Sequence, residues 1–260
     1  MSELWEVDDI EVARRHLRDV AHLAGLHDRR QRMEQRRQVY FDTADRRFLR
    51  AGLCLSVTSS PEGHRAETES LTSEARGPRG AATELAANSE AALRVASGAV
   101  GDQIRALAGR LALAPIAARH VWLETRILGR DGEEPVLTID LEQSAAIDGA
   151  DLDLGSGAAG SPARLHLHDT QHQDAAPLLQ ALANGTGFRV AATACDTRLL
   201  ARELQGNWLP DLGSTAITPD LTATELAFAT LRRQWLASIA HEPGTRLGVA
   251  TPSPRRCPIV

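Results

Sequence analysis

The segment Pro135–Ala145 carries polar side chains that could do chemistry. Val136, Thr138, Asp140 and Glu142 recur at every second position, which in a β-strand places them on one face. Two carboxylates on one face could hold a hard cation, because Mg²⁺ takes oxygen ligands and usually combines one or two carboxylates with substrate phosphates. The pattern fits two polar positions on the solvated face of a sheet equally well.

A second candidate is the segment RLHLHD at Arg164–Asp169, which is expected to be a strand. His166 and His168 would project from the same face, and His172 follows closely. Imidazoles at this spacing could bind a transition metal. Partly exposed histidines without a metal are the more common explanation of such a pattern.

Arginine accounts for all 29 basic residues of the chain, which contains no lysine. The planar guanidinium binds phosphate oxygens in bidentate fashion, whereas any mechanism that needs a lysine ammonium is excluded. The bias toward arginine is also what a GC-rich genome would produce. The basic cluster Arg29–Arg37 could approach polyphosphate or another anion, or it could be a solvated basic face.

The composition sets further limits. A chain of 260 residues is expected to form one domain of about 200 residues with an appendage. The net charge of -5 argues against general nucleic-acid binding. Three scattered cysteines fit a reduced cytoplasm, and neither a signal pattern nor a long apolar run predicts secretion or membrane insertion.

The expected elements indicate an α+β protein with an antiparallel sheet, for which closure into a barrel is plausible. Asp8 and Asp9 can cap a helix that follows a short strand. Strands are also expected around Tyr40 and at Leu49–Thr58, and helices at Asn88–Leu113 and Asp174–Asn184. Later come the strands Ile116–Leu128, Pro135–Ala145 and Arg164–Asp169, a loop at Asp148–Gly160, and a last amphipathic helix at about Thr222–His241.

The motif YFDT at Tyr40–Thr43, followed by L-R-A-G-L-x-L-x-V, resembles the second and third strands of the CYTH domain, the triphosphate tunnel metalloenzyme family. The order of elements fits that family over residues 1–205. A linker is expected at 206–218. Residues 219–260 resemble the start of a CHAD domain, a helical module associated with polyphosphate. This segment is expected to be a truncated CHAD-like helix followed by a disordered tail.

The resemblance implies an antiparallel, tunnel-like barrel in which basic side chains grip triphosphate and carboxylates hold Mg²⁺ or Mn²⁺. It implies phosphate contacts by Arg119, Arg126 and Arg198, and metal contacts by Glu3, Glu6, Glu84, Asp140 and Glu142. The alternative for the arginines is pairing with surface carboxylates. Arg119 and Arg126 are seven residues apart, so they share a strand face only if a bulge shifts the register.

The chain departs from the family pattern at several positions. Ser56 and Thr58 stand where basic residues are expected, and His166 and His168 replace a pair of glutamates. We therefore expect a cytoplasmic protein that binds triphosphate or polyphosphate with weakened or lost hydrolase activity. The alternatives are an active metal-dependent triphosphatase and a non-catalytic interaction module. In the latter, the helical tail docks a partner or a second copy. The stripe Phe228–Ile239 of the last helix is expected to pack on the body of the protein or on a partner helix.

Overall fold

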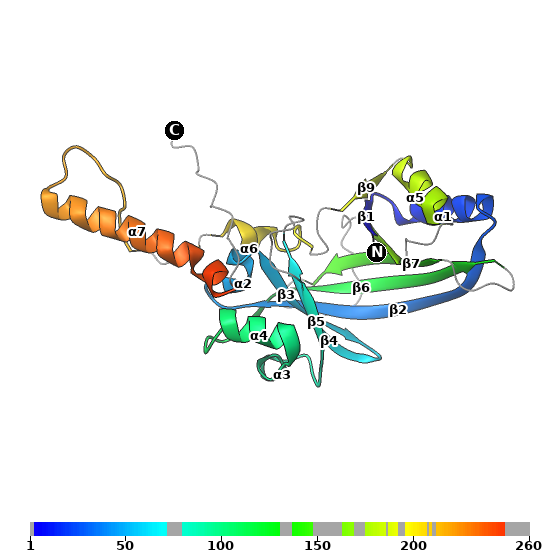
Figure 1. Cartoon of the computed structure of the whole chain (residues 1–260), viewed down its shortest axis with the longest axis horizontal. Helices are drawn as coiled ribbons and strands as arrows, with labels where there is room; N and C mark the ends of the chain where they lie inside the picture. Colours follow the sequence, from blue (N-terminus) through cyan, green and yellow to red (C-terminus); the bar gives the residue numbers. More distant parts are fainter. Residues whose placement is uncertain are drawn as a thin grey trace. The chain divides into compact units, whose positions relative to one another are not determined.

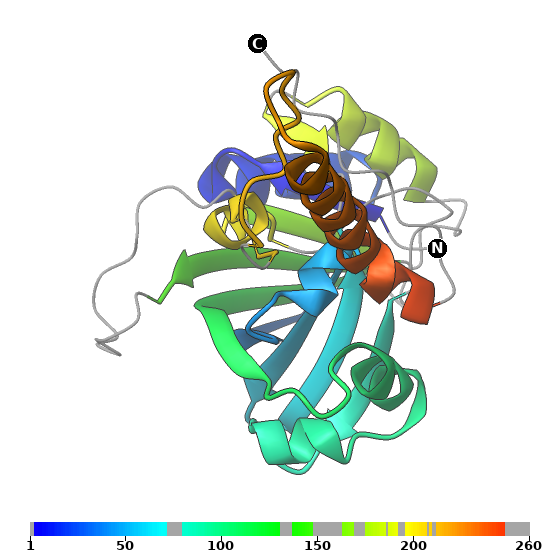
Figure 2. The ribbon, with the colours of Figure 1, turned by 90° about the vertical axis from the view of Figure 1, so that its left-hand side faces the viewer.

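The fold was analysed in a computed structural model of the chain (Figures 1 and 2). It describes residues 3–71, 80–130, 137–147, 163–168, 175–185, 187–191, 196–206, 208–209 and 212–247. The predicted loop at Asp148–Gly160, His172 and the tail from residue 248 lie outside these ranges. The chain divides into two compact units. Unit 1 comprises Met1–Val39, Thr58–Gly63 and Ala117–Ala194, and unit 2 comprises Tyr40–Val57, His64–Ile116 and Cys195–Val260.

Unit 1 holds most of the long strands and two helices. Its elements are β1 (Glu3–Val7), α1 (Ile10–Leu23), most of β2 (His27–Asp42), most of β6 (Ala114–Gly129), β7 (Leu137–Ala146), β8 (Ala163–His168), α5 (Ala175–Ala183) and β9 (Phe188–Val190). Helix α1 begins where predicted, because the Asp9 carboxylate accepts hydrogen bonds from the N–H groups of Glu11 and Val12.

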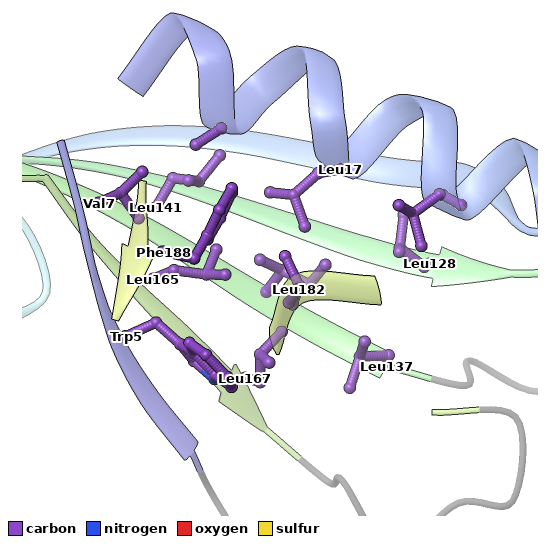
Figure 3. Close-up of a cluster of buried hydrophobic side chains, with 14 of the residues drawn as sticks. Trp5, Val7, Leu17, Leu128, Leu137, Leu141, Leu165, Leu167, Leu182 and Phe188 are labelled. Atoms are coloured by element: carbon purple, nitrogen blue, oxygen red, sulfur yellow. The ribbon is translucent and has the colours of Figure 1, made fainter. Parts of the chain in front are cut away.

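The core of unit 1 lies between α1 and one face of the sheet (Figure 3). Leu137, Ile139 and Leu141 alternate along β7 and are almost fully buried in this cluster. Leu17 of α1 and Leu165 of β8 pack with them. Because side chains alternate across a strand, the residues that alternate with these three apolar side chains face the other side of the sheet. The predicted common face of Thr138, Asp140 and Glu142 is thereby confirmed.

The strands form one nine-stranded sheet in the order β5-β4-β3-β2-β6-β7-β8-β1-β9. The predicted antiparallel α+β fold with flanking helices and a C-terminal helix is confirmed. Its described strands end at β5 and β9 in the hydrogen-bonding order, so ladder pairing does not close the sheet completely. Among the described residues, no helix has the length and apolar character needed to span a membrane.

Unit 2 contains the YFDT motif and most of the remaining elements. They are α2 (Arg47–Arg50), most of β3 (Leu53–Ser60), β4 (Gly63–Ser70), β5 (Ala81–Leu85), α3 (Glu90–Arg94), α4 (Gly98–Leu107), α6 (Ala201–Gln205) and α7 (Ala223–Arg246). The prediction of a strand from Leu49 is wrong at its start, since Leu49 lies in α2 and the strand begins at Leu53.

The side chain of Asp42 explains this short helix. Its Oδ1 accepts hydrogen bonds from the N–H groups of Thr43 (2.7 Å) and Phe48 (3.0 Å), and its Oδ2 accepts one from Leu49 (3.1 Å). Asp42 is fully buried. One carboxylate thus accepts the hydrogen bonds of the backbone N–H groups at the start of α2. In a strand, these N–H groups would point in other directions.

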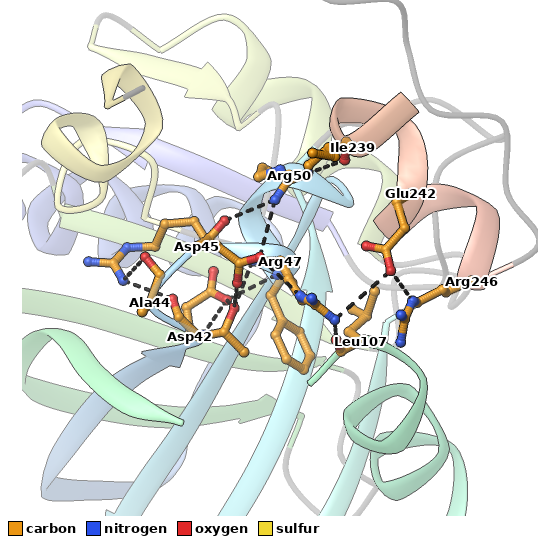
Figure 4. Close-up of polar contacts among 12 residues, drawn as sticks. Asp42, Ala44, Asp45, Arg47, Arg50, Leu107, Ile239, Glu242 and Arg246 are labelled. Atoms are coloured by element: carbon orange, nitrogen blue, oxygen red, sulfur yellow. Dashed lines mark hydrogen bonds and ion pairs between the residues drawn. The ribbon is translucent and has the colours of Figure 1, made fainter. Parts of the chain in front are cut away.

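Two arginines of α2 connect it to other helices of unit 2 (Figure 4). Arg47 donates to the Leu107 carbonyl at 3.2 Å, and its guanidinium lies 4.0 Å from the Glu242 carboxylate of α7. Arg50 donates to the Ile239 carbonyl of the same helix. The C-terminal half of α7 is therefore held by polar contacts as well as by packing.

The apolar stripe of α7 is only partly covered. Phe228, Leu231 and Trp235 remain more than half exposed, whereas Ala229 on the adjacent side of the helix is buried. The stripe therefore does not pack on the described part of unit 2 as a whole. Docking of a partner or of a second copy on this stripe stays a prediction.

Gly101 in α4 gives a test of the packing in unit 2. A Cβ at this position would lie 1.9 Å from the Ala96 carbonyl oxygen. We expect Gly101→Ala to lower the free energy of unfolding by about 1–3 kcal/mol, although alanine favours a helix by about 1 kcal/mol over glycine. Urea unfolding measures the change, with the exposed Ala99→Ser as control. Unchanged stability would contradict the close approach of these two segments.

Candidate functional site

Charged residues of alternating sign form a row across four strands of unit 1. Arg189 of β9 pairs in register with Glu6 of β1, Glu6 with Arg164 of β8, and Arg164 with Glu142 of β7. Residues directly opposite one another in adjacent strands share a sheet face. The row therefore lies on the face opposite the leucine core, which we call the polar face.

Arg119 of β6 lies on the polar face and is almost completely buried. Its Nε donates to Gln38 Oε1 at 2.7 Å, and a terminal nitrogen donates to Ser144 Oγ at 3.3 Å. The same nitrogen lies 2.8 Å from Glu142 Oε1. That carboxylate oxygen is buried and has no partner with hydrogen-bond geometry among the described residues, and the ion pair with Arg119 stabilises its charge.

Asp140 and the two histidines form a second group on the polar face. Asp140 accepts a hydrogen bond from Thr125 Oγ1 at 2.5 Å, and its other oxygen lies 2.9 Å from His168 Nε2. The rings of His166 and His168 meet edge to face. Burial lowers the pKa of His166, although the nearby carboxylates of Glu142 and Asp140 oppose that shift. His166 is therefore held mainly as the neutral imidazole at neutral pH.

Strand β2 contributes a small cavity of about 180 Å³, which we call the β2 cavity. Arg30, Arg32, Glu34 and Arg36 line it, together with two side chains of β6. Glu34 lies between two of the arginines, at 2.9 Å from Arg36 and 3.3 Å from Arg32. Because Arg36 and Gln38 are two residues apart, and Gln38 contacts Arg119, the cavity opens on the polar face.

Arg126 lies on the opposite face of the sheet from Arg119. Ten consecutive residue pairs join β6 to β7 from Arg119–Ala146 to Leu128–Leu137, so no bulge shifts the register between the two arginines. The Arg126 Nε donates to Glu124 Oε1 at 2.6 Å. Glu124 also accepts from Arg14 of α1 at 2.8 Å, which identifies this as the helix-covered face.

The remaining predicted residues are distributed over both units. Glu3 pairs in register with Leu167, on the strand that also holds Glu6. Glu84 lies in β5 of unit 2, opposite Arg65, and is exposed. Arg198 belongs to the turn before α6, also in unit 2, where its carbonyl accepts from Ala201. Of the predicted set, unit 1 brings together Arg119, Glu142, Asp140 and Glu6 on the polar face.

The described residues supply carboxylates for a cation but do not assemble a complete ligand set. No group of three or more His, Cys, Asp and Glu side chains among them is placed to hold a metal. Asp140 and Glu142 are two residues apart on one face, yet both already have partners. This donor set fits a cation that is completed by oxygens of a bound phosphate rather than one held by protein alone.

Sequence reasoning did not place the β2 cavity in the site. The signal was present, because Arg30, Arg32, Glu34 and Arg36 occupy alternate positions within the basic cluster and Gln38 continues the alternation. Such alternation predicts a charged strand face. It was obscured by Arg29 and Arg37, which make the segment look uniformly basic.

The comparisons with known proteins concern the fold. No protein-family model and no curated protein matches this chain. Among solved structures, it is similar to an adenylyl cyclase candidate from Hippeastrum with a dominant triphosphatase activity, at 10% identity and a TM-score of 0.50, over 79% of this chain and 99% of that one. Adenylate cyclase candidates from Bacillus halodurans (14% identity, TM-score 0.47, 76% and 97% covered) and Vibrio parahaemolyticus (11%, 0.40, 77% and 97%) are further matches. The Hippeastrum likeness supports the fold alone, and this chain has a CYTH-like fold.

Proposed function

We propose that this protein binds a triphosphate or polyphosphate chain on the polar face of unit 1. The observation that supports this most directly is the β2 cavity, where Arg30, Arg32 and Arg36 line one hollow. Guanidinium groups are well suited to phosphate oxygens because each offers several N–H donors in one plane. Arg119 and Arg164, which are both buried, lie on further strands of the same face.

The charges of this face disfavour efficient hydrolysis. Glu34 pairs with Arg32 and Arg36, Glu142 pairs with Arg119, and Glu6 lies opposite Arg164. Much of the positive charge is thereby neutralised before any ligand arrives. Stabilising the transition state of phosphoryl transfer needs donors and cations that are preorganised around the phosphate. Hydrolase activity is therefore proposed to be weak or lost.

A divalent cation fits this proposal as a companion of the ligand. Asp140 and Glu142 would be its protein ligands, and Mg²⁺ or Mn²⁺ bound there would offset phosphate charge. The role of the chain's own residues is to hold these carboxylates in place. Thr125 and His168 orient Asp140 through its two oxygens, while Arg119 holds Glu142.

The binding proposal is tested with tripolyphosphate and a matched pair of variants. Arg36→Gln removes a guanidinium that lines the β2 cavity, whereas Arg37→Gln removes its exposed neighbour, which does not. We expect Arg36→Gln to weaken tripolyphosphate binding about fivefold, equivalent to about 1 kcal/mol for a partly exposed charge. Isothermal titration calorimetry measures both affinities. Equal affinities would show that the ligand does not use this cavity.

An active metal-dependent triphosphatase is the second candidate, favoured by the four carboxylates that accompany the arginines on the polar face. They are Glu6, Glu34, Asp140 and Glu142. Phosphate release from tripolyphosphate with Mg²⁺ or Mn²⁺ decides between the candidates. Turnover that Glu142→Gln abolishes, without loss of tripolyphosphate binding, would establish the enzyme and overturn the proposal of binding alone.

A further inference from the structure

A cavity of about 700 Å³ lies beside the C-terminal half of α7 in unit 2. The wall that α7 contributes consists of Trp235, Ser238, Ile239 and Glu242, and the segment after α6 adds Trp208 and Leu209. The cavity is large enough to take up several side chains of a partner. Nothing in the proposed function uses this cavity, which we call the α7 cavity.

The charged groups around the α7 cavity are already paired with one another. Asp45 accepts a hydrogen bond from Arg47 at 3.1 Å and lies 3.5 Å from Arg50. Glu242 pairs with Arg246 and lies 4.0 Å from Arg47. The cavity therefore has no excess charge with which to attract an ionic ligand. What it offers to a partner is its aromatic and aliphatic surface.

The apolar stripe of α7 leads directly into this cavity. Phe228, Leu231, Trp235, Ser238 and Glu242 follow one another at spacings of three, four, three and four residues, which places them on one face of the helix. The first three are 53%, 60% and 61% exposed. Large apolar side chains that lie together on a surface mark an interaction site. One helix face thus carries projecting side chains in its first half and a cavity beside its second half.

We propose that a second copy of this chain docks on the face, with the two α7 helices antiparallel about a two-fold axis at Trp235. When Trp235 lies opposite its counterpart, Leu231 lies opposite Ile239 and Phe228 lies opposite Glu242. The projecting side chains of each copy then reach the α7 cavity of the other. A two-fold interface requires a surface that is complementary to itself, and the combination of stripe and cavity on one helix face meets this requirement.

The same register limits the repulsion between like charges. The two copies of Arg232 are offset by six positions, or about 9 Å along the helix axis. Each Arg232 donates to the Ser214 carbonyl of its own chain at 3.3 Å, which holds the guanidinium beside its own copy. A parallel arrangement would instead place each Arg232 directly beside its counterpart.

The available area suits a weak dimer. A covered aromatic side chain buries about 150–250 Å², so the exposed parts of Phe228 and Trp235 supply roughly 250 Å² per copy. With Leu231 and the cavity walls, we expect about 1,000 Å² in total, which is at the lower end for specific interfaces. The expected dissociation constant is about 10 μM.

The first test measures the association of the full chain by sedimentation velocity between about 1 and 300 μM. Leu231→Glu places a charge within the stripe. Leu226→Glu is the matched control, because Leu226 is also exposed but lies five residues earlier, on the far side of the helix. We expect the parent to dimerise, Leu231→Glu to dimerise at least tenfold more weakly, and Leu226→Glu to behave like the parent. Circular dichroism checks that both variants remain helical.

A second pair of variants tests the cavity. Ser238→Arg introduces a long charged side chain into the α7 cavity, whereas Ala237→Arg introduces the same side chain at an exposed neighbour that does not line it. Ser238→Arg should weaken the dimer at least tenfold, and Ala237→Arg should leave it unchanged. A stripe that associates without the cavity would respond equally to both substitutions, which would contradict the proposed interface.

Cross-linking decides the orientation of the two helices. Gln234 and Ala227 are exposed and one heptad apart on the same flank of α7. In a Cys195→Ser/Cys257→Ser background, which leaves only the buried Cys54, a short bismaleimide should link two copies of Gln234→Cys. Two copies of Ala227→Cys lie about 24 Å apart along the axis in the antiparallel register and should stay unlinked. The proposal is overturned if both variants cross-link equally, or if the parent is monomeric up to about 300 μM.

Discussion

Replacing Asp42 by alanine should lower the free energy of unfolding by about 3 kcal/mol or more at pH 7. Three buried backbone N–H groups lose their acceptor in this variant, and each orphaned donor costs about 1–3 kcal/mol. Asp42→Asn retains the Oδ1 acceptor and loses only the bond from Leu49, so we expect a smaller decrease. Urea unfolding followed by circular dichroism measures both. Equal stability of the alanine variant and the parent would contradict the proposed role of Asp42.

The same carboxyl group predicts a pH dependence of stability. Burial raises the pKa of Asp42 from 3.8 to about 6, although the three N–H donors oppose that shift. A carboxyl with a raised folded-state pKa contributes stability that is fully present below the unfolded pKa and is lost as the pH rises through the folded one. We expect a loss of about 2 kcal/mol between pH 4 and pH 6.5.

Asp42→Asn provides the reference for that pH dependence, because its amide does not titrate. The difference in unfolding free energy between the parent and this variant should change over the same pH interval. Urea unfolding at pH 4, 5, 6 and 6.5 gives the profile. A difference that stays constant with pH would show that folding does not raise the pKa of Asp42.

The parts of the fold that the sequence predicted have strong local signals. Helix α1 has its Asp9 cap, and β7 alternates buried leucines and isoleucine with polar residues. Helix α2 was missed because its donors are satisfied by Asp42, five residues before the helix begins. A pattern of neighbouring residues does not reveal that a side chain turns back over such a distance.

Only part of the candidate site could be predicted, because several of its contacts join residues that are far apart in the sequence. The common face of Asp140 and Glu142 follows from spacing within one strand. The contact of Arg119 with Gln38 joins residues 81 positions apart and depends on the order of β2 and β6 in the sheet. The separation of Arg119 from Arg126 depended on whether a bulge was present, which only the register with β7 decides.

Arg126 is the predicted phosphate ligand whose surroundings differ most from that role, and its replacement should have a large effect on stability. Glu124 is 3% exposed and accepts from Arg126, Arg14 and Gln31. Arg126→Met removes the cation that lies closest to this buried carboxylate. Breaking a buried ion pair from one side costs about 3–5 kcal/mol, so we expect a loss of that size in urea unfolding. A loss below about 1 kcal/mol would contradict a tightly coupled pair.

The double variant Arg126→Met/Glu124→Leu separates the cost of an unpaired charge from the worth of the pair. Replacing both partners by apolar side chains removes the uncompensated carboxylate, so much of the lost stability should return. Arg14 and Gln31 then lose a partner, but Arg14 is partly exposed and can be solvated. Because Arg126 lies on the helix-covered face, this folded double variant should bind tripolyphosphate as tightly as the parent. If tripolyphosphate binding fell instead, the ligand would have to reach the helix-covered face, and the assignment of its site to the polar face would be wrong.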